Sequence, residues 1–457
     1  MSNNAGLLEL VARGKKDIFF TANPKIAFVH SVYIRASPFT KEIYVAKPRN
    51  IPEWGKWVDF DLDHRGDILQ HFYLRMELPT WLPPSVQVTN KTGIVTYDAS
   101  GTTFGYCNHI GFQVIDKIQL FQDQVKIQEI FGEHLLWRVQ QKNTFAIVPI
   151  IGEQIGSYVE SPLTIGRTAS GLSLRVPIPI FHDAGIPMAA LQNERYRLRI
   201  YLRKMEEVIV ASDYRLEPNP WSQPLIVQSV KAGPLDTTQH SLPKTAMKTI
   251  GISLESTQIY ISPPLKMVMK AQALRIPYMT TQFQQYILAD NLMAAASLNP
   301  QNVYRYPFVI DFIGSVRQFI LGFRSDANTI AGRRSDYASS TNGEFIQSLR
   351  LNIANIDRVK QWPTAVFRQV TSYWKHNGLI PPTSYIYSMT FGGYDGKDPM
   401  GTINFSRAVD AILYLTLAPI EYDSRNISRK TYAMLYAESW NLYEISGGKG
   451  RLMFDDS

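Results

Sequence analysis

Cysteine is almost absent from this sequence, in which Cys107 is the single cysteine among 457 residues. One cysteine cannot form a disulfide within the chain, so a packed core has to stabilise the fold, which fits a reducing compartment. Long apolar runs are also lacking, and no uncharged stretch reaches the roughly 18 residues that a transmembrane helix needs. The first residues do not follow the basic and then apolar order of a signal peptide, so we expect none.

Charged residues are scarce at 19% of the chain, whereas aromatic residues make up 12%. Few charges and many aromatic side chains favour a β-rich fold with large buried interfaces. The 47 basic residues exceed the 39 acidic ones, which gives a formal net charge of +8. Spread over the whole chain, this excess is too dilute to predict a specific nucleic-acid partner, because such binding needs a concentrated basic patch.

The densest group of basic residues lies in one predicted strand. Arg195, Arg197 and Arg199 alternate there with aromatic and aliphatic residues. This period-two pattern places the arginines on the exposed face of a half-buried strand. A neighbouring acidic subunit would fit this face as well as DNA would, and we predict the three arginines as interface residues.

Motifs for catalysis are lacking as well. The sequence contains no phosphate-binding loop, no paired zinc ligands and no nucleophile elbow. His64 and His71 are the closest pair of histidines, but their neighbours are typical of a solvated turn followed by a strand. The acidic residues at 59, 61 and 63 lack the glycine and the closing glutamate of a calcium loop. We therefore predict no catalytic residues, no cofactor, no metal site and no small-molecule substrate, and no enzyme.

What the sequence does contain is strands. Alternating or continuous apolar runs rich in β-branched and aromatic residues are separated by Gly, Pro, Asn and Asp. The predicted strands of the first half are Ile26–Ile34, Ile43–Val45, Ile68–Leu78, Gln113–Phe121, Leu172–Ile180, Tyr196–Leu202 and Ile252–Ile261. Those of the second half are Phe308–Ile313, Arg317–Phe323, Ile346–Ile353, Ser384–Phe391, Ala411–Leu417 and Tyr432–Ile445. Three short helices are predicted at Ile130–Gln140, Ala189–Asn193 and Leu265–Gln272.

The chain is too long for one compact sandwich, so we predict two consecutive antiparallel sandwiches with room for eight strands in each. A weak internal sequence similarity suggests that the two halves are related β domains, because a Pro-Met pair precedes both Leu198–Leu202 and Ile412–Leu415 by about a dozen residues. The predicted segments are an N-terminal arm (1–24), the first sandwich (25–264, with a proline-rich loop excursion at 213–246), a linker (265–272), the second sandwich (273–446) and a C-terminal tail (447–457).

Two further groups of apolar residues are candidates for an interface. Leu7, Leu8 and Val11 lie on one side of a short helix in the arm. This helix would either rest on a membrane or an underlying protein, or tuck against its own domain. Trp54 and Trp57 lie in a connection, where they would either anchor a neighbouring subunit or cap the core of their own domain.

Several blocks in the same order along the chain resemble one protein family. They are residues 6–12 (GLLELVA), 66–69 (GDIL), 108–120 (NHIGFQVIDKIQL), 132–135 (GEHL), 176–181 (VPIPIF), 356–358 (IDR), 401–407 (GTINFSR) and 446–448 (SGG). Together they resemble the double jelly-roll major capsid proteins of nucleocytoplasmic large DNA viruses. The sequence departs from the family pattern at 36–39 (ASPF) and 398–401 (DPMG), which leaves a divergent major capsid protein or a minor paralogue.

The resemblance implies an all-β double jelly roll with a few short helices and a structural function. Such a protein would form homotrimeric, pseudo-hexagonal capsomers that tile the outer shell of an icosahedral double-stranded DNA virus. Its partners would be itself, neighbouring capsomers, minor capsid and penton proteins, and an internal membrane reached through the arm. It would be found in the virion capsid, after being made and assembled in the host cytoplasm.

Two other functions fit the same composition. A transient scaffold that shapes a viral membrane would share the fold and leave before the particle is complete. A carbohydrate-binding β-sandwich would use the abundant tyrosine and tryptophan to stack on sugars, although no carboxylate pair of a glycosidase stands out at a strand end.

Overall fold

The structure is a computed structural model with two compact units, Met1–Pro38 and Phe39–Ser457. It describes residues 38–79, 95–97, 104–142, 148–157, 172–183, 185–192, 194–211, 225–229, 236–240, 249–288, 305–330, 332–338, 344–376, 378, 380, 384–392, 401–408, 410–417 and 430–454. The arm residues Leu7, Leu8 and Val11 and the predicted strand Ile26–Ile34 lie outside the described residues.

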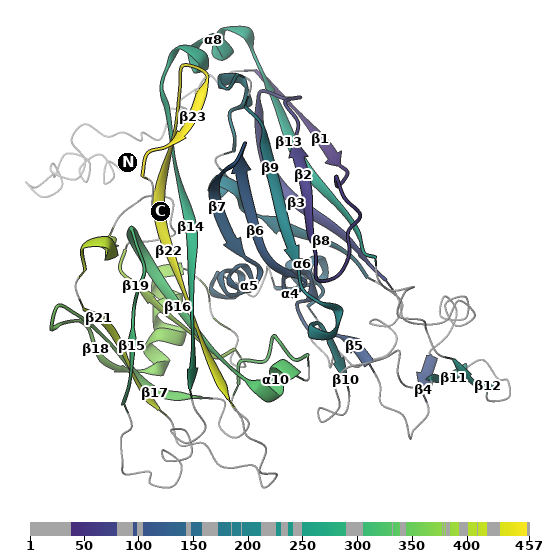
Figure 1. Cartoon of the computed structure of the whole chain (residues 1–457), viewed down its shortest axis with the longest axis vertical. Coiled ribbons are helices and arrows are strands. Elements are labelled where there is room, and N and C mark those ends of the chain that lie inside the picture. The colour runs from purple at the N-terminus through teal and green to yellow at the C-terminus, as the bar shows by residue number, and fades with distance from the viewer. Residues whose placement is uncertain are drawn as a thin grey trace, which may run out of the picture. The chain divides into compact units, whose positions relative to one another are not determined.

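Eight strands of the first half form a sandwich of two antiparallel sheets (Figure 1). These strands are β1 (Phe39–Ala46), β2 (Trp57–Leu62), β3 (Ile68–Leu78), β6 (Ile115–Gln122), β7 (Val125–Phe131), β8 (Leu172–Ile178), β9 (Tyr196–Leu202) and β13 (Gly251–Ile261). One sheet has the order β1-β13-β3-β8 and the other has the order β2-β9-β6-β7. Residues along β9 alternate between buried and half-buried, as the period-two pattern predicts.

The second half forms another sandwich. Its strands are β14 (Leu274–Leu288), β15 (Arg305–Val309), β16 (Ser315–Ser325), β17 (Ile346–Ile353), β18 (Ile356–Pro363), β19 (Ile386–Thr390), β21 (Ala411–Leu417) and β22 (Thr431–Ser446). The sheets have the orders β14-β22-β16-β19 and β15-β21-β17-β18. Two short strands extend the first of them, since β20 (Ile403–Asn404) pairs with β16 and β23 (Lys449–Leu452) pairs with β22.

The two sandwiches share one strand order. Counted along each sandwich, strands one, eight, three and six form one sheet, and strands two, seven, four and five form the other. The predicted fold, two consecutive eight-stranded antiparallel jelly rolls with few helices, is therefore confirmed. The internal sequence similarity has a structural counterpart, because its two apolar segments are β9 and β21, the seventh strand of each sandwich.

Helices are short and lie in the connections. They are α4 (Ile110–Gln113), α5 (Gly132–Gln141), α6 (Val148–Ile155), α8 (Pro263–Ala271), α10 (Asp326–Ile330) and α11 (Thr371–His376), with the 3-10 turns η1 (Ile180–Asp183), η2 (Met188–Ala190), η3 (Met205–Glu207) and η6 (Phe405–Arg407) and the π-helical turn η5 (Val366–Val370). The predicted helices at 130–140 and 265–272 correspond to α5 and α8, whereas the one at 189–193 is only η2.

Two predicted segments contain structure that their description as loop and tail omits. The excursion at 213–246 includes β11 (Leu225–Ser229) and β12 (Asp236–His240), which form a small sheet with β4 (Val95–Tyr97). A second small sheet pairs β5 (Phe104–Tyr106) with β10 (Ile209–Ala211). The tail at 447–457 includes β23, because Gly447 and Gly448, at φ 59° and 80°, reverse the chain onto β22. The predicted linker at 265–272 falls within α8 and its C-cap, and the domain boundaries remain a proposal.

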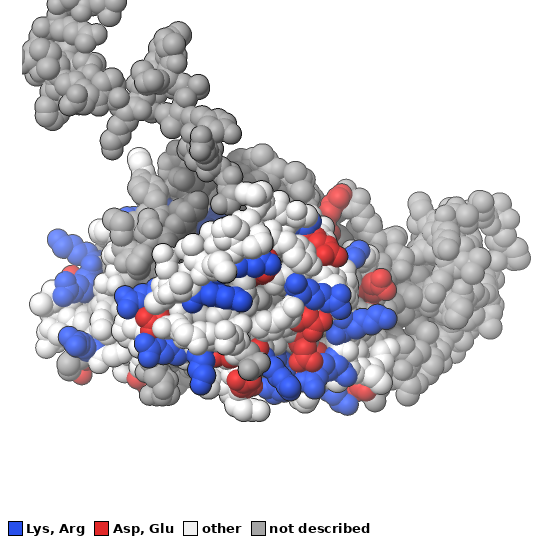
Figure 2. All heavy atoms as spheres, turned by 90° about the horizontal axis from the view of Figure 1, so that it is seen from above, with Lys and Arg blue, Asp and Glu red and all other residues white. Residues whose placement is uncertain are grey.

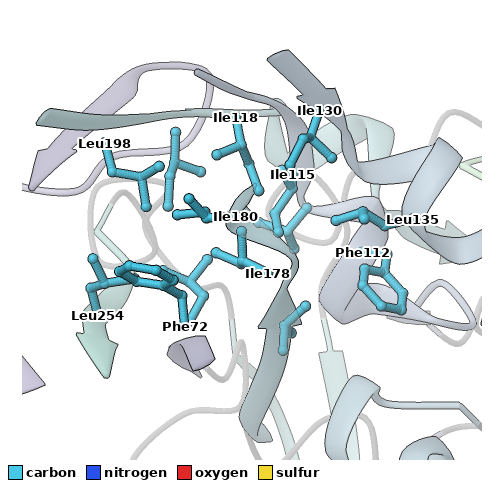
Figure 3. Packing of buried hydrophobic residues seen from close by; sticks show 14 of the residues in the cluster. Phe72, Phe112, Ile115, Ile118, Ile130, Leu135, Ile178, Ile180, Leu198 and Leu254 are labelled. Atoms are coloured by element: carbon cyan, nitrogen blue, oxygen red, sulfur yellow. The ribbon is translucent and has the colours of Figure 1, made fainter. Parts of the chain in front are cut away.

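Each sandwich has a core between its sheets. In the first, Phe72 and Leu254 from one sheet face Leu198 and Ile118 from the other (Figure 3). The second core is separate and includes Phe319, Leu321, Leu413 and Leu435. The first cluster also takes in residues of the second sandwich, among them Ile320, Met434 and Tyr436. The central strands β16 and β22 of the sheet β14-β22-β16-β19 are therefore buried on both faces, which explains their almost unbroken burial.

Candidate functional site

The groups considered for catalysis or metal binding are engaged in ordinary contacts. Asp59 accepts two hydrogen bonds from Arg199, at 2.8 and 2.9 Å, and Asp61 pairs with Arg49 at 3.3 Å. His64 Nε2 lies 2.9 Å from the carbonyl oxygen of Glu194, and His71 is an exposed residue of β3. Within the described part of the chain, no group of three or more His, Cys, Asp or Glu side chains is placed to hold a metal ion. No helix among these residues is long and apolar enough to span a membrane.

The most elaborate arrangement of polar residues lies where the two sandwiches meet. Helix α5 follows β7 of the first sandwich and lies against the outer face of the sheet β14-β22-β16-β19 of the second. Alternation along β22 creates this contact, because Leu435 and Ala437 enter the second core while Tyr436 and Glu438 point the other way. A strand with one face in each core couples the packing of the two sandwiches.

Glu438 is the centre of one buried ionic cluster. Its carboxylate lies 2.9 Å from His134 Nε2, 3.1 Å from Arg138 Nε and 3.7 Å from Arg317. Burial alone would raise the pKa of Glu438, but Arg138, His134 and Arg317 hold this pKa well below its ordinary value. The pKa of His134 is lowered, chiefly by burial, against the opposing effect of Glu438. The cluster therefore joins an ionised carboxylate to arginines from both sandwiches.

Glu133 forms a second buried cluster next to the first. Its carboxylate pairs with Arg324 of β16 and accepts a hydrogen bond of 2.8 Å from the hydroxyl of Tyr337. Gln113 donates to the same Tyr337 hydroxyl at 3.2 Å. Tyr337 lies 204 residues from Glu133 and 224 residues from Gln113 in the sequence, so the cluster links the first sandwich directly to the second.

Aromatic packing fills the space between the clusters. The buried Trp137 of α5 makes edge-to-face contacts with Tyr337 and Tyr436, at ring-centroid distances of 5.3 and 5.1 Å. Such geometry adds about 0.5–1.5 kcal/mol per pair beyond area burial. A Cβ built on Gly322 of β16 would lie 2.5 Å from the Trp137 ring, so the indole needs a residue without a side chain there.

The junction continues along β7 and β14. Tyr278 donates to the carbonyl oxygen of Ile127, and Gln128 donates to that of Met279, both at 2.8 Å. At the far end of β22, Tyr443 donates to Gln122 at 2.7 Å. The two sandwiches thus share hydrogen bonds, ion pairs and apolar packing over the length of one sheet.

The arginines predicted as interface residues lie on the outer face of the sheet β2-β9-β6-β7. Arg195 is exposed, whereas Arg197 and Arg199 are half-buried. The guanidinium of Arg199 lies 4.2 Å from the ring centroid of Trp57, and that of Arg197 lies 5.1 Å from that of Phe121. On the face drawn in Figure 2, basic side chains are interspersed with acidic and uncharged ones. Within the sheet, Asp59 pairs with Arg199 and lies 3.8 Å from Arg197, so this face contains an acidic partner of its own.

The two tryptophans of the predicted interface differ in their surroundings. Trp54 is partly buried and packs against the first core, which is the capping arrangement. Trp57 is 42% exposed at the start of β2.

Sequence reasoning did not predict the junction residues as a site, although Glu133 and His134 lie in the block GEHL that carries the family resemblance. The sequence did contain a signal for this site, because charged residues lie among the apolar residues of the predicted helix, and Glu438 lies among those of the predicted strand.

Among the described residues, large exposed apolar side chains lie on β1 and on the segment after β18, as well as at other positions. Phe39, Ile43 and Val45 project from the edge strand β1 with exposures of 58%, 65% and 39%. Trp362 at the end of β18 and the following Val370, Tyr373 and Trp374 are 46–59% exposed. Clusters of exposed apolar residues on a soluble protein commonly mark surfaces that bind other molecules.

Comparisons with known proteins agree with this architecture. Residues 277–450 match the family described as large eukaryotic DNA virus major capsid protein. The chain is 21% identical to the major capsid protein of Phaeocystis pouchetii virus, with 99% of each chain aligned. It is 26% identical to probable capsid protein 4 of Acanthamoeba polyphaga mimivirus over 47% of this chain and 40% of that protein. The chain thus spans less than half the length of this relative.

Solved structures show the same fold. The PBCV-1 virus capsid structure has a TM-score of 0.69 at 14% identity, covering 94% of this chain and all of that one. The Faustovirus major capsid protein has a TM-score of 0.63 at 14% identity, covering 95% and 94%. The fold thus defines the class of double jelly-roll proteins. Within this class, the chain is similar to the major capsid proteins of large eukaryotic DNA viruses, which confirms the resemblance predicted from the sequence.

Proposed function

We propose that this protein is a structural capsid protein of a large icosahedral double-stranded DNA virus, built to form homotrimeric, pseudo-hexagonal capsomers. The observation that carries the proposal is the identical strand order of the two sandwiches, joined by a buried junction. Three copies around a threefold axis would place six similar sandwiches in a ring. A ring of six similar units approximates a hexagon, which tiles a surface without gaps.

Closed threefold symmetry gives each copy the same contacts. Stable interfaces commonly bury about 800 Å² per partner. The exposed apolar residues of β1 and of the segment after β18 are available for such contacts. Contacts between capsomers would be smaller and weaker, which would allow misplaced units to leave a growing shell.

The further partners follow from this role. Neighbouring capsomers and minor capsid and penton proteins would bind the edges of the block. The N-terminal arm, with Leu7, Leu8 and Val11, would reach an internal membrane or an underlying protein. Trp57 and the arginines at 195, 197 and 199 remain proposed contacts between subunits. We assign no catalytic activity, and we place the protein in the virion capsid after assembly in the host cytoplasm.

A minor capsid paralogue is the second candidate. Two relatives of this chain, probable capsid protein 4 and capsid protein 1, come from one virus, Acanthamoeba polyphaga mimivirus. One virus can therefore encode several related chains. A minor component would share the fold and occupy fewer positions in the shell.

Quantitative mass spectrometry of purified particles tests this function. A shell-forming protein is expected to be the most abundant polypeptide of the particle. A minor paralogue would be present in clearly fewer copies than a second jelly-roll chain. Absence from complete particles, with presence in infected cells, would contradict both and favour a transient scaffold.

A further inference from the structure

The junction inside the chain is a contact between a helix and a sheet. The helix α5 lies in the connection from the fifth strand of the first sandwich, β7, to the sixth, β8. It contacts the outer face of the sheet that contains the first and eighth strands of the second sandwich, β14 and β22. Trp137, His134, Arg138 and Glu133 are among the helix residues that reach this sheet.

The second sandwich has a counterpart of that helix. The connection from its fifth strand to its sixth contains η5 and α11. Phe367, Ser372 and His376 of this segment are buried. Tyr373 and Trp374 lie on its other side, with exposures of 56% and 59%. This segment therefore has an exposed aromatic surface, and it lies in the same connection of its sandwich as the one that carries Trp137 in the first sandwich.

The first sandwich has a counterpart of the contacted sheet. Its first and eighth strands are β1 and β13, and β1 is an edge strand. Tyr44 and Ala46 of β1 point to the core, so the alternate residues Ile43 and Val45 point outward. With Phe39 they form an exposed, mainly apolar strip, which also contains Lys41, on the face that corresponds to the one covered by α5.

We propose that the aromatic surface of α11 in one copy binds the β1 strip of the next copy, repeating between chains the contact that α5 makes within one chain. This inference rests on the proposed homotrimer and names the surfaces that build it. Each copy has one α11 surface and one β1 strip, so the contact is head-to-tail and closes when the third copy meets the first. Internal and intermolecular contacts would then alternate around the ring.

The chemistry of the two contacts would differ. Inside the chain, Glu438 on the covered sheet binds Arg138 from the helix. On the β1 face, the buried Glu255 already pairs with Arg175 at 2.5 Å and with Arg75 at 3.9 Å, both from its own sheet. The contact between copies would therefore be mainly apolar. We expect the trimer to persist at high salt, since apolar contacts are not screened.

Cysteine cross-linking tests the two surfaces directly. The native Cys107 is 1% exposed, and burial raises the pKa of its thiol to about 12, so it will not compete. A chain that carries both Ile43→Cys and Trp374→Cys, treated with a short bis-maleimide, should give covalent dimers and trimers. A mixture of the two single variants should stop at dimers, because each copy then offers one reactive position. The control is Ile43→Cys with Val125→Cys, since Val125 is 56% exposed and lies outside both surfaces.

A second pair of variants keeps the test independent of cross-linking geometry. Tyr373→Ser with Trp374→Ser removes the aromatic surface and should shift the trimer to monomer at fixed concentration, with the melting temperature of the monomer unchanged. Met267→Ser on α8, where the side chain is 74% exposed, should leave the trimer intact. A trimer that tolerates the Tyr373/Trp374 variant and gives no cross-link at 43 and 374 overturns this inference but not the trimer. A wild-type chain that never forms trimers overturns the proposed function itself.

Discussion

At the scale of single residues, the junction depends on positions where one side chain decides the packing. Gly322 is such a position, because the ring of the fully buried Trp137 occupies the space that a Cβ would fill. Glu438 is another, because arginines from both sandwiches converge on its carboxylate. Each of these residues contacts residues that are distant in the sequence, and each can be tested by a conservative substitution.

Gly322→Ala is expected to destabilise the protein by about 1–3 kcal/mol, the usual cost of overfilling a packed core. The new methyl group would lie 2.5 Å from two ring carbons of Trp137, which is held between Tyr337 and Tyr436. Urea unfolding measures the change. Gly152→Ala in α6 is the control, because its Cβ would meet only ordinary contacts at 3.4 Å or more. Equal stability of the two variants would contradict this packing.

Glu438→Gln should cost about 3–5 kcal/mol, since it leaves buried arginines without their carboxylate. The matched control is Asp61→Asn, which breaks an exposed pair with Arg49 and should cost less than about 1 kcal/mol. Denaturant unfolding of the two variants side by side compares the costs. If Glu438→Gln were as mild as Asp61→Asn, the cluster would not stabilise the junction.

The buried histidines predict a loss of stability in acid. Burial lowers the pKa of His376 to about 4, and that of His134 is lowered as well. The unfolded chain binds these protons near pH 6.5, so between about pH 6.5 and 4 it holds more protons than the folded chain, and stability falls as pH falls. The expected loss at pH 5 is on the order of 2 kcal/mol for His376.

Unfolding free energies at pH 7 and pH 5 measure this effect. His376→Gln should reduce the difference between the two pH values, because the variant has one fewer buried group that gains a proton on unfolding. A wild-type protein that is equally stable at both pH values would contradict the assigned burial of these side chains.

At the scale of elements, the sequence predicts strands well where the apolar pattern is regular. The bounds of β3, β9, β17 and β21 coincide with the predicted ones. Strand β14, the partner of β22 along its whole length, was not predicted. Its glutamines and Pro277 obscure the apolar pattern of a strand, but β14 is a sheet edge, where proline needs no partner for its missing N–H.

The same physics explains the other strand prolines. Pro177 lies in β8, Pro307 in β15 and Pro363 in β18, and each of these strands is at the edge of its sheet. A proline inside one of these strands therefore marks an edge position rather than the absence of a strand.

The junction is the part that sequence reasoning could not supply. Glu133 and Tyr337 are 204 residues apart, and Glu438 and Arg138 lie in elements of different sandwiches. A local pattern shows that such residues are buried, but only the tertiary fold shows which of them meet. The predicted interface arginines show the same limit. Their alternation along β9 was predicted correctly, but the sequence did not show that Asp59 of the same sheet is an acidic partner for them.

At the scale of the whole molecule, the two sandwiches behave as one unit with a repeated plan. The repetition gives one internal contact, α5 on the sheet of β14 and β22, and leaves one equivalent pair of surfaces exposed. A monomer would leave these apolar residues in water, whereas a threefold ring would cover them in every copy. The number of chains in the assembled particle therefore tests whether the fold serves the proposed function.

The solution mass, measured by light scattering after size exclusion, tests this claim most directly. The account predicts a mass near 156 kDa, three times the 52.0 kDa of one chain. This mass should persist at high salt and decrease in the Tyr373→Ser/Trp374→Ser variant. A mass near 52.0 kDa over the whole accessible concentration range would contradict the self-assembling capsomer.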